Sequence, residues 1–274
     1  MKTILHPTDF SDNSLNALNY ALEFCKRSGS ELIVFHAYGS PIDLANRTED
    51  EKSVRDKANE SMEWLNSEYI EGSGVECETM IAGGSPVQSI LEISDEHEID
   101  LIVMGTKGKS DFDNIIFGSS TVEVILDSNS PVMAVPEGVS FSEIRNITYA
   151  ADYREEDFPI IWELIQIATY LEADLHILNF ASQKSLVEEL MFRGFRDMIN
   201  EKFQYKDIHV KLIYGEDLTE SLHGYTDNIE GALLAMGYYR TKFLNSLSRR
   251  ESVKEMALHT HAPLLVVPES SDES

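Results

Sequence analysis

Three glycines and a run of hydroxyl residues stand at a spacing that suits the binding of a phosphate. Gly105 and Gly108 bracket a short turn, and nine residues after Gly108 comes Gly118, which is followed by Ser119, Ser120 and Thr121. Glycine lets the backbone approach a bulky anion closely, and hydroxyls that open a helix cap it or donate to phosphate oxygens. This stretch predicts a loop that holds the phosphates of a nucleotide.

Apolar segments on both sides of the loop must position it. Residues 99–104 and 131–135 are apolar runs that predict buried strands, and a helical pattern of apolar residues lies between the loop and the second run. Across residues 1–136 such runs alternate with amphipathic helical segments, which gives five strands and four helices. This alternation predicts an α/β fold with a parallel sheet covered on both faces.

The ends of the first two predicted strands are expected to meet the glycine loop. Ligands of an open parallel sheet bind at the carboxyl ends of its strands, where the strand order reverses. The carboxylate of Asp9 can accept hydrogen bonds from an adenine amine or a ribose hydroxyl, although an Asx-turn explains it equally well. Ala37 has a small side chain beside which a flat base can lie. The site is thus expected to include Pro7, Thr8, Asp9 and Ala37.

The second half of the chain repeats the first. Residues 145–153 align with residues 2–10 without a gap, so that Asp152 falls on Asp9 and Tyr153 on Phe10. Three more segments match in order and at nearly constant offsets, which indicates a tandem duplication. The predicted domains are residues 1–138 and 143–270.

These motifs resemble those of the universal stress protein superfamily. The spacing Gly105-x2-Gly108-x9-Gly118-Ser119 fits the G-2x-G-9x-G-(S/T) signature, and residues 7–11 and 130–136 fit its start and end. The resemblance implies two tandem Rossmann-like (adenine nucleotide alpha hydrolase-like) domains, each a five-stranded parallel sheet flanked by helices. It also implies a stress protein of the cytoplasm that binds ATP or AMP. The implied nucleotide contacts are Pro7, Thr8, Asp9, Ala37, Met104, Gly105, Gly108, Gly118, Ser119, Ser120 and Thr121.

The second domain departs from the signature. Arg240 and Arg250 stand at the second and third glycine positions, Glu251 stands at the serine, and Phe180 replaces Ala37. The ordinary nucleotide site is therefore expected to be lost, which leaves this domain a regulatory or structural role. Arg240 and Arg250 either pair with neighbouring carboxylates or form a side-chain anion site.

Composition excludes several classes of partner. The formal net charge of −26 argues against nucleic acid and anionic membrane surfaces, because phosphate groups are repelled. No apolar run approaches the ~20 residues of a membrane span, and the start of the chain enters a strand without a signal peptide. These features predict a cytoplasmic protein in which ATP is bound together with Mg²⁺. No metal site on protein side chains is predicted, since only His259 and His261 lie close together, and the two cysteines are expected to be inert.

Two rival functions remain open beside nucleotide binding. No set of residues is arranged for catalysis, yet the same site can serve a slow ATPase or a phosphotransferase, with Asp9 and a nearby lysine contributing. A scaffold that keeps the motif for folding alone is the other alternative. The superfamily also implies that the last strands of the two domains pair, so that one chain forms a pseudo-dimer. A homodimer and an unidentified protein partner are further expectations.

Overall fold

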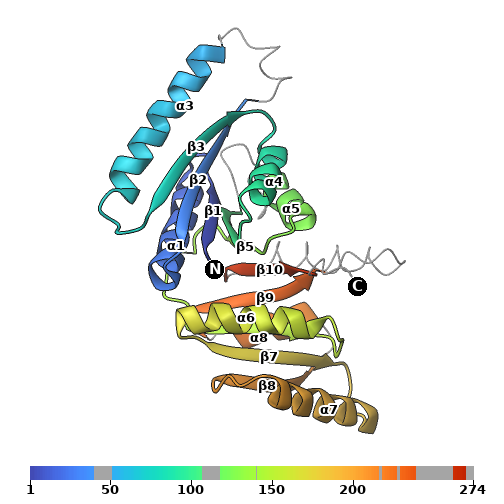
Figure 1. Cartoon of the computed structure of the whole chain (residues 1–274). Helices are drawn as coiled ribbons and strands as arrows, with labels where there is room; N and C mark the ends of the chain where they lie inside the picture. The colour runs from blue at the N-terminus through green and yellow to red at the C-terminus, as the bar shows by residue number, and fades with distance from the viewer. Residues whose placement is uncertain are drawn as a thin grey trace. The chain divides into compact units, whose positions relative to one another are not determined.

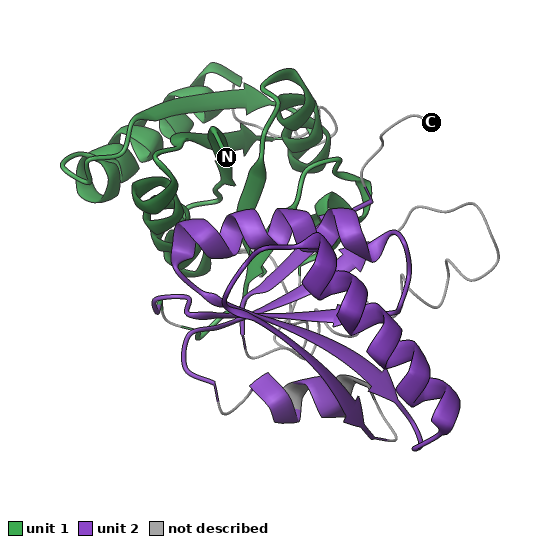
Figure 2. Ribbon diagram, turned by 60° about the horizontal axis from the view of Figure 1, so that its bottom comes forward, with its two compact units in different colours: residues 1–141 green, residues 142–274 purple. Residues whose placement is uncertain are grey.

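The computed structural model describes residues 1–39, 51–106, 118–139, 141–215, 218–226, 229–238 and 262–269. The chain divides into two compact units, residues 1–141 and 142–274 (Figure 2). Helices and strands alternate in both (Figure 1). Within the described residues, no helix has the length and apolarity needed to cross a bilayer.

The N-terminal unit is a parallel α/β sheet. Its strands lie in the order β3-β2-β1-β4-β5, and every neighbouring pair is parallel. Its elements are β1 (Thr3–Pro7), α1 (Asp12–Ser28), β2 (Glu31–Tyr38), α3 (Glu51–Leu65), a π-helical turn (Asn66–Ile70), β3 (Cys77–Gly83), α4 (Pro86–Glu96), β4 (Leu101–Gly105), α5 (Ser119–Asp127) and β5 (Val132–Val135).

The strand order of this unit reverses at β1. The chain moves from β1 outward to β2 and β3, then crosses back to β4 and β5 on the other side of β1. Right-handed crossovers therefore place α1 and α3 on one face of the sheet and α4 and α5 on the other, as Figure 1 shows. The carboxyl ends of β1 and β4 flank the reversal, which is where an open sheet binds its ligands.

Helix α1 shows how local sequence sets these elements. The Ser11 side chain accepts a hydrogen bond from the Ser14 amide at 3.2 Å, which caps the start of the helix. Gly29 ends the helix with a left-handed φ of 71°, and its amide donates to the Cys25 carbonyl. The face between these ends buries Leu18, among other apolar side chains, against the sheet.

One predicted strand lies two residues later than expected. The alternating pattern at residues 75–81 predicts a strand there, whereas β3 spans Cys77–Gly83. The parallel pairing with β2 explains the shift. The paired residues run from Leu32 with Cys77 to Tyr38 with Gly83, so β3 begins and ends within one residue of β2. Pairing with a neighbour thus sets the ends of an edge strand that is only half-buried.

The C-terminal unit has the same order of strands. Its neighbouring strands are all parallel and follow the order β8-β7-β6-β9-β10, with helices on both faces (Figure 2). Its elements are β6 (Asn146–Ala151), α6 (Asp157–Leu171), β7 (Asp174–Ala181), α7 (Leu186–Lys202), β8 (Ile208–Tyr214), α8 (Leu218–Thr226), β9 (Ala232–Tyr238) and β10 (Leu264–Pro268).

The two units also share unusual backbone angles. Phe10 follows β1 with a φ of 59°, and Tyr153 follows β6 with a φ of 58°. Gly29 ends α1 and Glu172 ends α6, both in the left-handed region. Residues with side chains rarely adopt this conformation, because the β-carbon crowds the following carbonyl. In the pair Phe10 and Tyr153 and in the pair Gly29 and Glu172, the two residues are as far apart in the sequence as residues 2 and 145, which begin the repeat.

The two cysteines lie in protected surroundings. Cys25 is buried in α1, and burial raises the pKa of its thiol to about 12. Burial also raises the pKa of the Cys77 thiol, to about 11. Because the thiolate is the reactive form of cysteine, both side chains are held in their unreactive form near neutral pH.

Candidate functional site

A pocket opens at the carboxyl edge of the N-terminal sheet, where the strand order reverses. It has a volume of about 230 Å³ and is lined by the ends of β1, β2 and β4 and by the starts of α4 and α5. The structure thus brings together ten of the predicted site residues, Pro7, Thr8, Asp9, Ala37, Met104, Gly105, Gly118, Ser119, Ser120 and Thr121. The eleventh, Gly108, lies outside the described residues.

Five lining residues were not predicted from the sequence. Ser14 reaches the pocket from the first turn of α1, and α4 contributes a wall that the glycine motif does not reveal. Neighbours of predicted residues along β2 complete the set, which is Ser14, Phe35, His36, Pro86 and Ile90. The sequence carried one usable signal, since Gly83-Gly84-Ser85-Pro86 turns the chain back toward the same edge of the sheet.

The side chain of Thr8 is the centre of a hydrogen-bond network. Its hydroxyl oxygen accepts from the Phe10 amide at 3.1 Å and from the Ser14 hydroxyl at 2.8 Å. Its carbonyl accepts from Nδ1 of His36 at 2.8 Å, which joins the ends of β1 and β2. With both acceptor positions of the hydroxyl in use, its proton is left as the group that can donate to a ligand.

The buried side chain of His6 lies next to this network. Its Nδ1 donates to the Val103 carbonyl at 2.8 Å, and its Nε2 lies 3.4 Å from the Ser14 hydroxyl. Burial lowers the pKa of His6 to about 4, against the smaller opposing effects of the Val103 carbonyl and the Asp9 charge. The imidazole is therefore neutral at physiological pH. Its Nδ1 joins β1 to β4, and its Nε2 lies beside the Ser14 hydroxyl of α1, whose proton goes to Thr8.

Asp9 has the local role that its Asx-turn alternative predicted. One carboxylate oxygen accepts from the Ser11 amide at 3.0 Å, so the side chain shapes the turn between β1 and α1. Asp9 also lines the pocket and is only partly buried, so its carboxylate lies where a ligand can reach it. Turn formation and ligand binding are compatible uses of this residue.

The start of α5 supplies backbone donors. Gly118 precedes the helix, and the first hydrogen bond inside the helix joins the Val122 amide to the Gly118 carbonyl. The amides of Ser119, Ser120 and Thr121 consequently have no partner within the helix, and they stand at the positive end of its dipole. Such an arrangement suits the binding of an oxyanion, and these three residues line the pocket.

Two of the predicted nucleotide contacts, Gly105 and Thr121, also hold neighbouring elements together. The Thr121 hydroxyl donates to the Gly105 carbonyl at 2.9 Å, so it ties α5 to the end of β4. Gly105 in turn lies against α1, because a β-carbon at this position would stand 2.8 Å from Nδ2 of Asn13 and 3.1 Å from its backbone. The structure gives the glycine a packing role that is independent of any ligand.

The remaining wall of the pocket, as far as the described residues form it, is apolar. Ala37, Ile90 and Met104 come from three different elements and face the same space. Among the described lining residues, Asp9 carries the only carboxylate and none is a lysine or an arginine. The described part of the pocket therefore fits a flat apolar group beside an anion bound by backbone amides, as an adenine nucleotide requires.

The corresponding edge of the C-terminal unit has different chemistry. Asp157 takes the place of Ser14 and is buried, and its carboxylate accepts from the Tyr149 hydroxyl at 2.7 Å and from two backbone amides. Phe180 takes the place of Ala37 and lies beside Gly215. A buried carboxylate and an aromatic ring thus stand where the N-terminal unit has small neutral groups. Arg240 and Arg250, the predicted anion-binding residues, lie outside the described residues, as do His259 and His261.

The matched family and relatives agree with this architecture. The family model that matches residues 1–136 is described as the universal stress protein family. A universal stress protein of Methanocaldococcus jannaschii is 29% identical over 153 residues, which cover 49% of this chain and 94% of that protein. One from Thermus aquaticus is 30% identical over 135 residues, which cover 49% of this chain and 98% of that protein.

A solved structure extends the likeness to both units. A universal stress protein from Archaeoglobus fulgidus covers 99% of this chain and is itself covered to 97%, with a TM-score of 0.75 and 22% sequence identity. At this level of identity the likeness concerns the fold alone, and it confirms the predicted α/β class with parallel strands flanked by helices.

Proposed function

This chain belongs to the universal stress protein family, and on that premise we propose that its N-terminal unit binds an adenine nucleotide, ATP or AMP. The observation that carries the proposal is the pocket itself. Three strand ends and the start of α5 bring ten residues singled out for nucleotide binding to one space. An anion joined to a flat apolar group would use both of its described walls.

Each wall then has a defined task. The base lies against Ala37, Ile90 and Met104, and the phosphates lie at the amides of Ser119 and Ser120. Asp9 accepts from the ribose or the base, and the Thr8 hydroxyl donates its remaining proton. With a single carboxylate among the described lining residues, Mg²⁺ is held by the phosphates and water rather than by the protein.

The C-terminal unit acts as a regulatory or structural partner without an ordinary nucleotide site. Phe180 and the buried Asp157 support this assignment, because a ring fills space that the base needs and a carboxylate repels phosphate. The parallel strand orders and shared left-handed residues support an origin by tandem duplication. The pairing of the last strands, a homodimer, a protein partner and the cytoplasmic location remain predictions.

Calorimetry with ATP, AMP and a cyclic nucleotide tests the proposal. We expect ATP or AMP to bind with one site per chain, and mass spectrometry of the protein as purified to identify the nucleotide that it carries. Turnover of ATP that is lost in Gly118→Val would assign a slow ATPase or phosphotransferase instead. Binding of none of the three would leave the scaffold function.

A further inference from the structure

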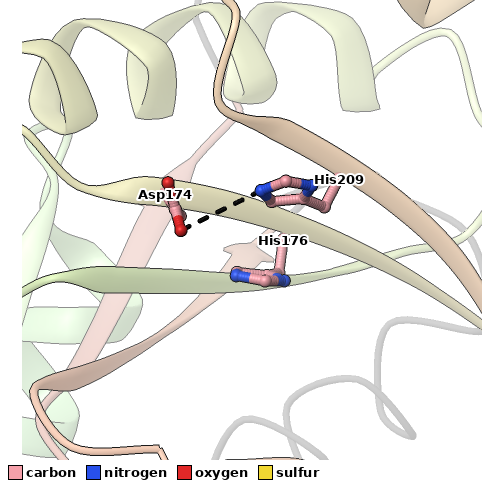
Figure 3. Close-up of side chains that lie close together, drawn as sticks. All are labelled: Asp174, His176 and His209. Carbon is pink, nitrogen blue, oxygen red and sulfur yellow. Dashed lines mark ion pairs between the residues drawn. The ribbon is translucent and has the colours of Figure 1, made fainter.

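Two histidines and an aspartate gather on one face of the C-terminal sheet, away from the edge discussed above. Asp174 and His176 are two residues apart near the start of β7, so their side chains project from the same face. His209 lies on β8 and is the register partner of His176. One ligand atom from each residue lies within 4.8 Å of the others. Figure 3 shows the three side chains grouped together.

His176 has one ring nitrogen bonded and the other unpaired. Its Nδ1 lies 2.9 Å from the Tyr225 hydroxyl of α8, whereas its Nε2 is buried without a hydrogen-bond partner among the described residues. A buried polar atom that lacks a partner is costly and calls for an explanation. A metal ion bound at Nε2 supplies one, since metal-binding imidazoles usually engage their other nitrogen in a hydrogen bond.

Small movements bring the three groups to bonding distances. Nε2 of His209 lies 3.9 Å from the Asp174 carboxylate, and the rings of His209 and His176 have centroids 4.8 Å apart. Zinc bonds nitrogen and oxygen at about 2.0–2.2 Å. Its ligand atoms must therefore lie closer to one another than His209 and Asp174 do in this structure. His209 is exposed and Asp174 is half-buried, so neither side chain is locked by packing and both can turn toward an ion.

The charged neighbours of the cluster are compatible with a cation. Lys211 is a basic group beside the cluster, and its Nζ donates to the Tyr225 hydroxyl at 2.8 Å. The Asp174 carboxylate offsets part of the positive charge of an ion bound here.

The fold does not need these residues. At the corresponding positions the N-terminal unit has Glu31, Ile33 and Glu78, and Ile33 pairs in register with Glu78 as His176 does with His209. The same sheet is therefore built with an isoleucine in the place of His176. Two imidazoles and a carboxylate are a donor set that suits zinc and neighbouring transition metals better than Mg²⁺.

We propose that Asp174, His176 and His209 bind one Zn²⁺ ion, with water completing its coordination. The site belongs to the C-terminal unit alone and lies at the amino-terminal ends of β7 and β8. The nucleotide proposal concerns the opposite, carboxyl ends of the strands in the other unit. Zinc binding is therefore independent of nucleotide binding, and either proposal can fail without the other.

Competition with a chromogenic chelator tests the site on the full chain. After treatment with EDTA, the protein is titrated with Zn²⁺, and we expect one equivalent to bind more tightly than the rest. His176→Ile and His209→Ala should each weaken this step at least about ten-fold. His176→Ile is expected to fold, because it installs the side chain of Ile33, and circular dichroism checks this.

Controls distinguish one specific zinc site from weak binding at the other histidines of the chain, which has eight in all. His97→Ala removes a histidine outside the cluster and should leave the tight step unchanged. Tyr225→Phe removes the hydroxyl that orients His176 and should weaken binding less than His176→Ile does. Equal zinc affinity in the wild type and the His176→Ile variant, or the absence of a tight equivalent, would overturn the proposal.

Discussion

The side-chain nitrogen of Asn13 lies 2.8 Å from the point where a β-carbon on Gly105 would stand. The nearest backbone atoms of Asn13 lie 3.1 Å from the same point, so movement of the side chain alone would not make room. The first glycine of the motif is therefore held in place by helix packing as well as by any ligand.

Gly105→Ala should destabilise the protein by about 1–3 kcal/mol, because the added methyl group overpacks the contact between β4 and α1. Urea denaturation of the full chain measures the change. Gly194→Ala is the matched control, since Gly194 lies in α7 with nothing within 4 Å of an added β-carbon. That change should raise stability by up to about 1 kcal/mol, because alanine favours helix. Equal effects at the two positions would contradict the packing argument.

Ala37→Phe should abolish nucleotide binding or weaken it at least about ten-fold, which is about 1.4 kcal/mol. The ring would occupy the wall assigned to the base, as Phe180 does at the corresponding place in the other unit. Calorimetry with ATP and AMP measures the loss, and thermal unfolding checks that the variant folds. Phe180→Ala is the reciprocal control and should leave binding in the N-terminal unit unchanged. Undiminished affinity in Ala37→Phe would place the base elsewhere.

The neutral state of His6 predicts a pH dependence of stability. Its pKa is about 4 in the folded protein and 6.5 in the unfolded chain, so the unfolded chain binds more protons between these values. The free energy of unfolding should therefore fall as the pH is lowered from about 6.5 to about 4, with a contribution from His6 of about 3 kcal/mol. Above pH 6.5 this contribution is fully present.

His6→Asn isolates the effect, because asparagine can still donate to the Val103 carbonyl but does not titrate. The wild type should be more stable than the variant above pH 6.5, and this difference in unfolding free energy should shrink, or reverse in favour of the variant, as the pH falls. Denaturation at several pH values measures both curves, and carboxylates elsewhere affect them alike. Parallel curves would show that His6 is not held neutral.

The buried carboxylate of Asp157 is expected to stabilise the fold, because it accepts three hydrogen bonds. Asp157→Ala should destabilise the protein by about 2–4 kcal/mol, because the Tyr149 hydroxyl and two amides lose their partner. Asp157→Ser should cost less, since Ser14 fills the same position in the other unit. Asp197→Ala, which alters an exposed ion pair with Arg196 at 3.2 Å, should change stability by no more than about 0.5 kcal/mol.

The sequence predicted the α/β class and most of the N-terminal pocket for a physical reason. Continuous apolar runs and helical periodicity report burial directly, and the glycine spacing ties β4 to α5 within one short segment. Pro7, Thr8 and Asp9 followed from the rule that the carboxyl ends of parallel strands meet at one edge. These features depend on local sequence or on general topology.

Contacts between distant segments were beyond the reach of the sequence. Ser14 and Ile90 line the pocket only because of how α1 and α4 rotate on the sheet, which periodicity does not fix to one residue. His6 gave no signal, since its role depends on the Val103 carbonyl across the sheet. Asp174, His176 and His209 also escaped notice, because the register of β7 against β8 brings His209 to the other two.

The left-handed residues Phe10 and Tyr153 have a consequence for engineering. Each turns the chain in the same way after the first strand of its unit, although one unit carries Pro7-Thr8-Asp9 there and the other Ala150-Ala151-Asp152. The backbone path is thus shared while the side chains differ. A transplant of residues 7–11 onto residues 150–154 therefore meets a matching backbone path, but it also needs Asp157→Ser, because Ser14 is the side-chain partner of Thr8.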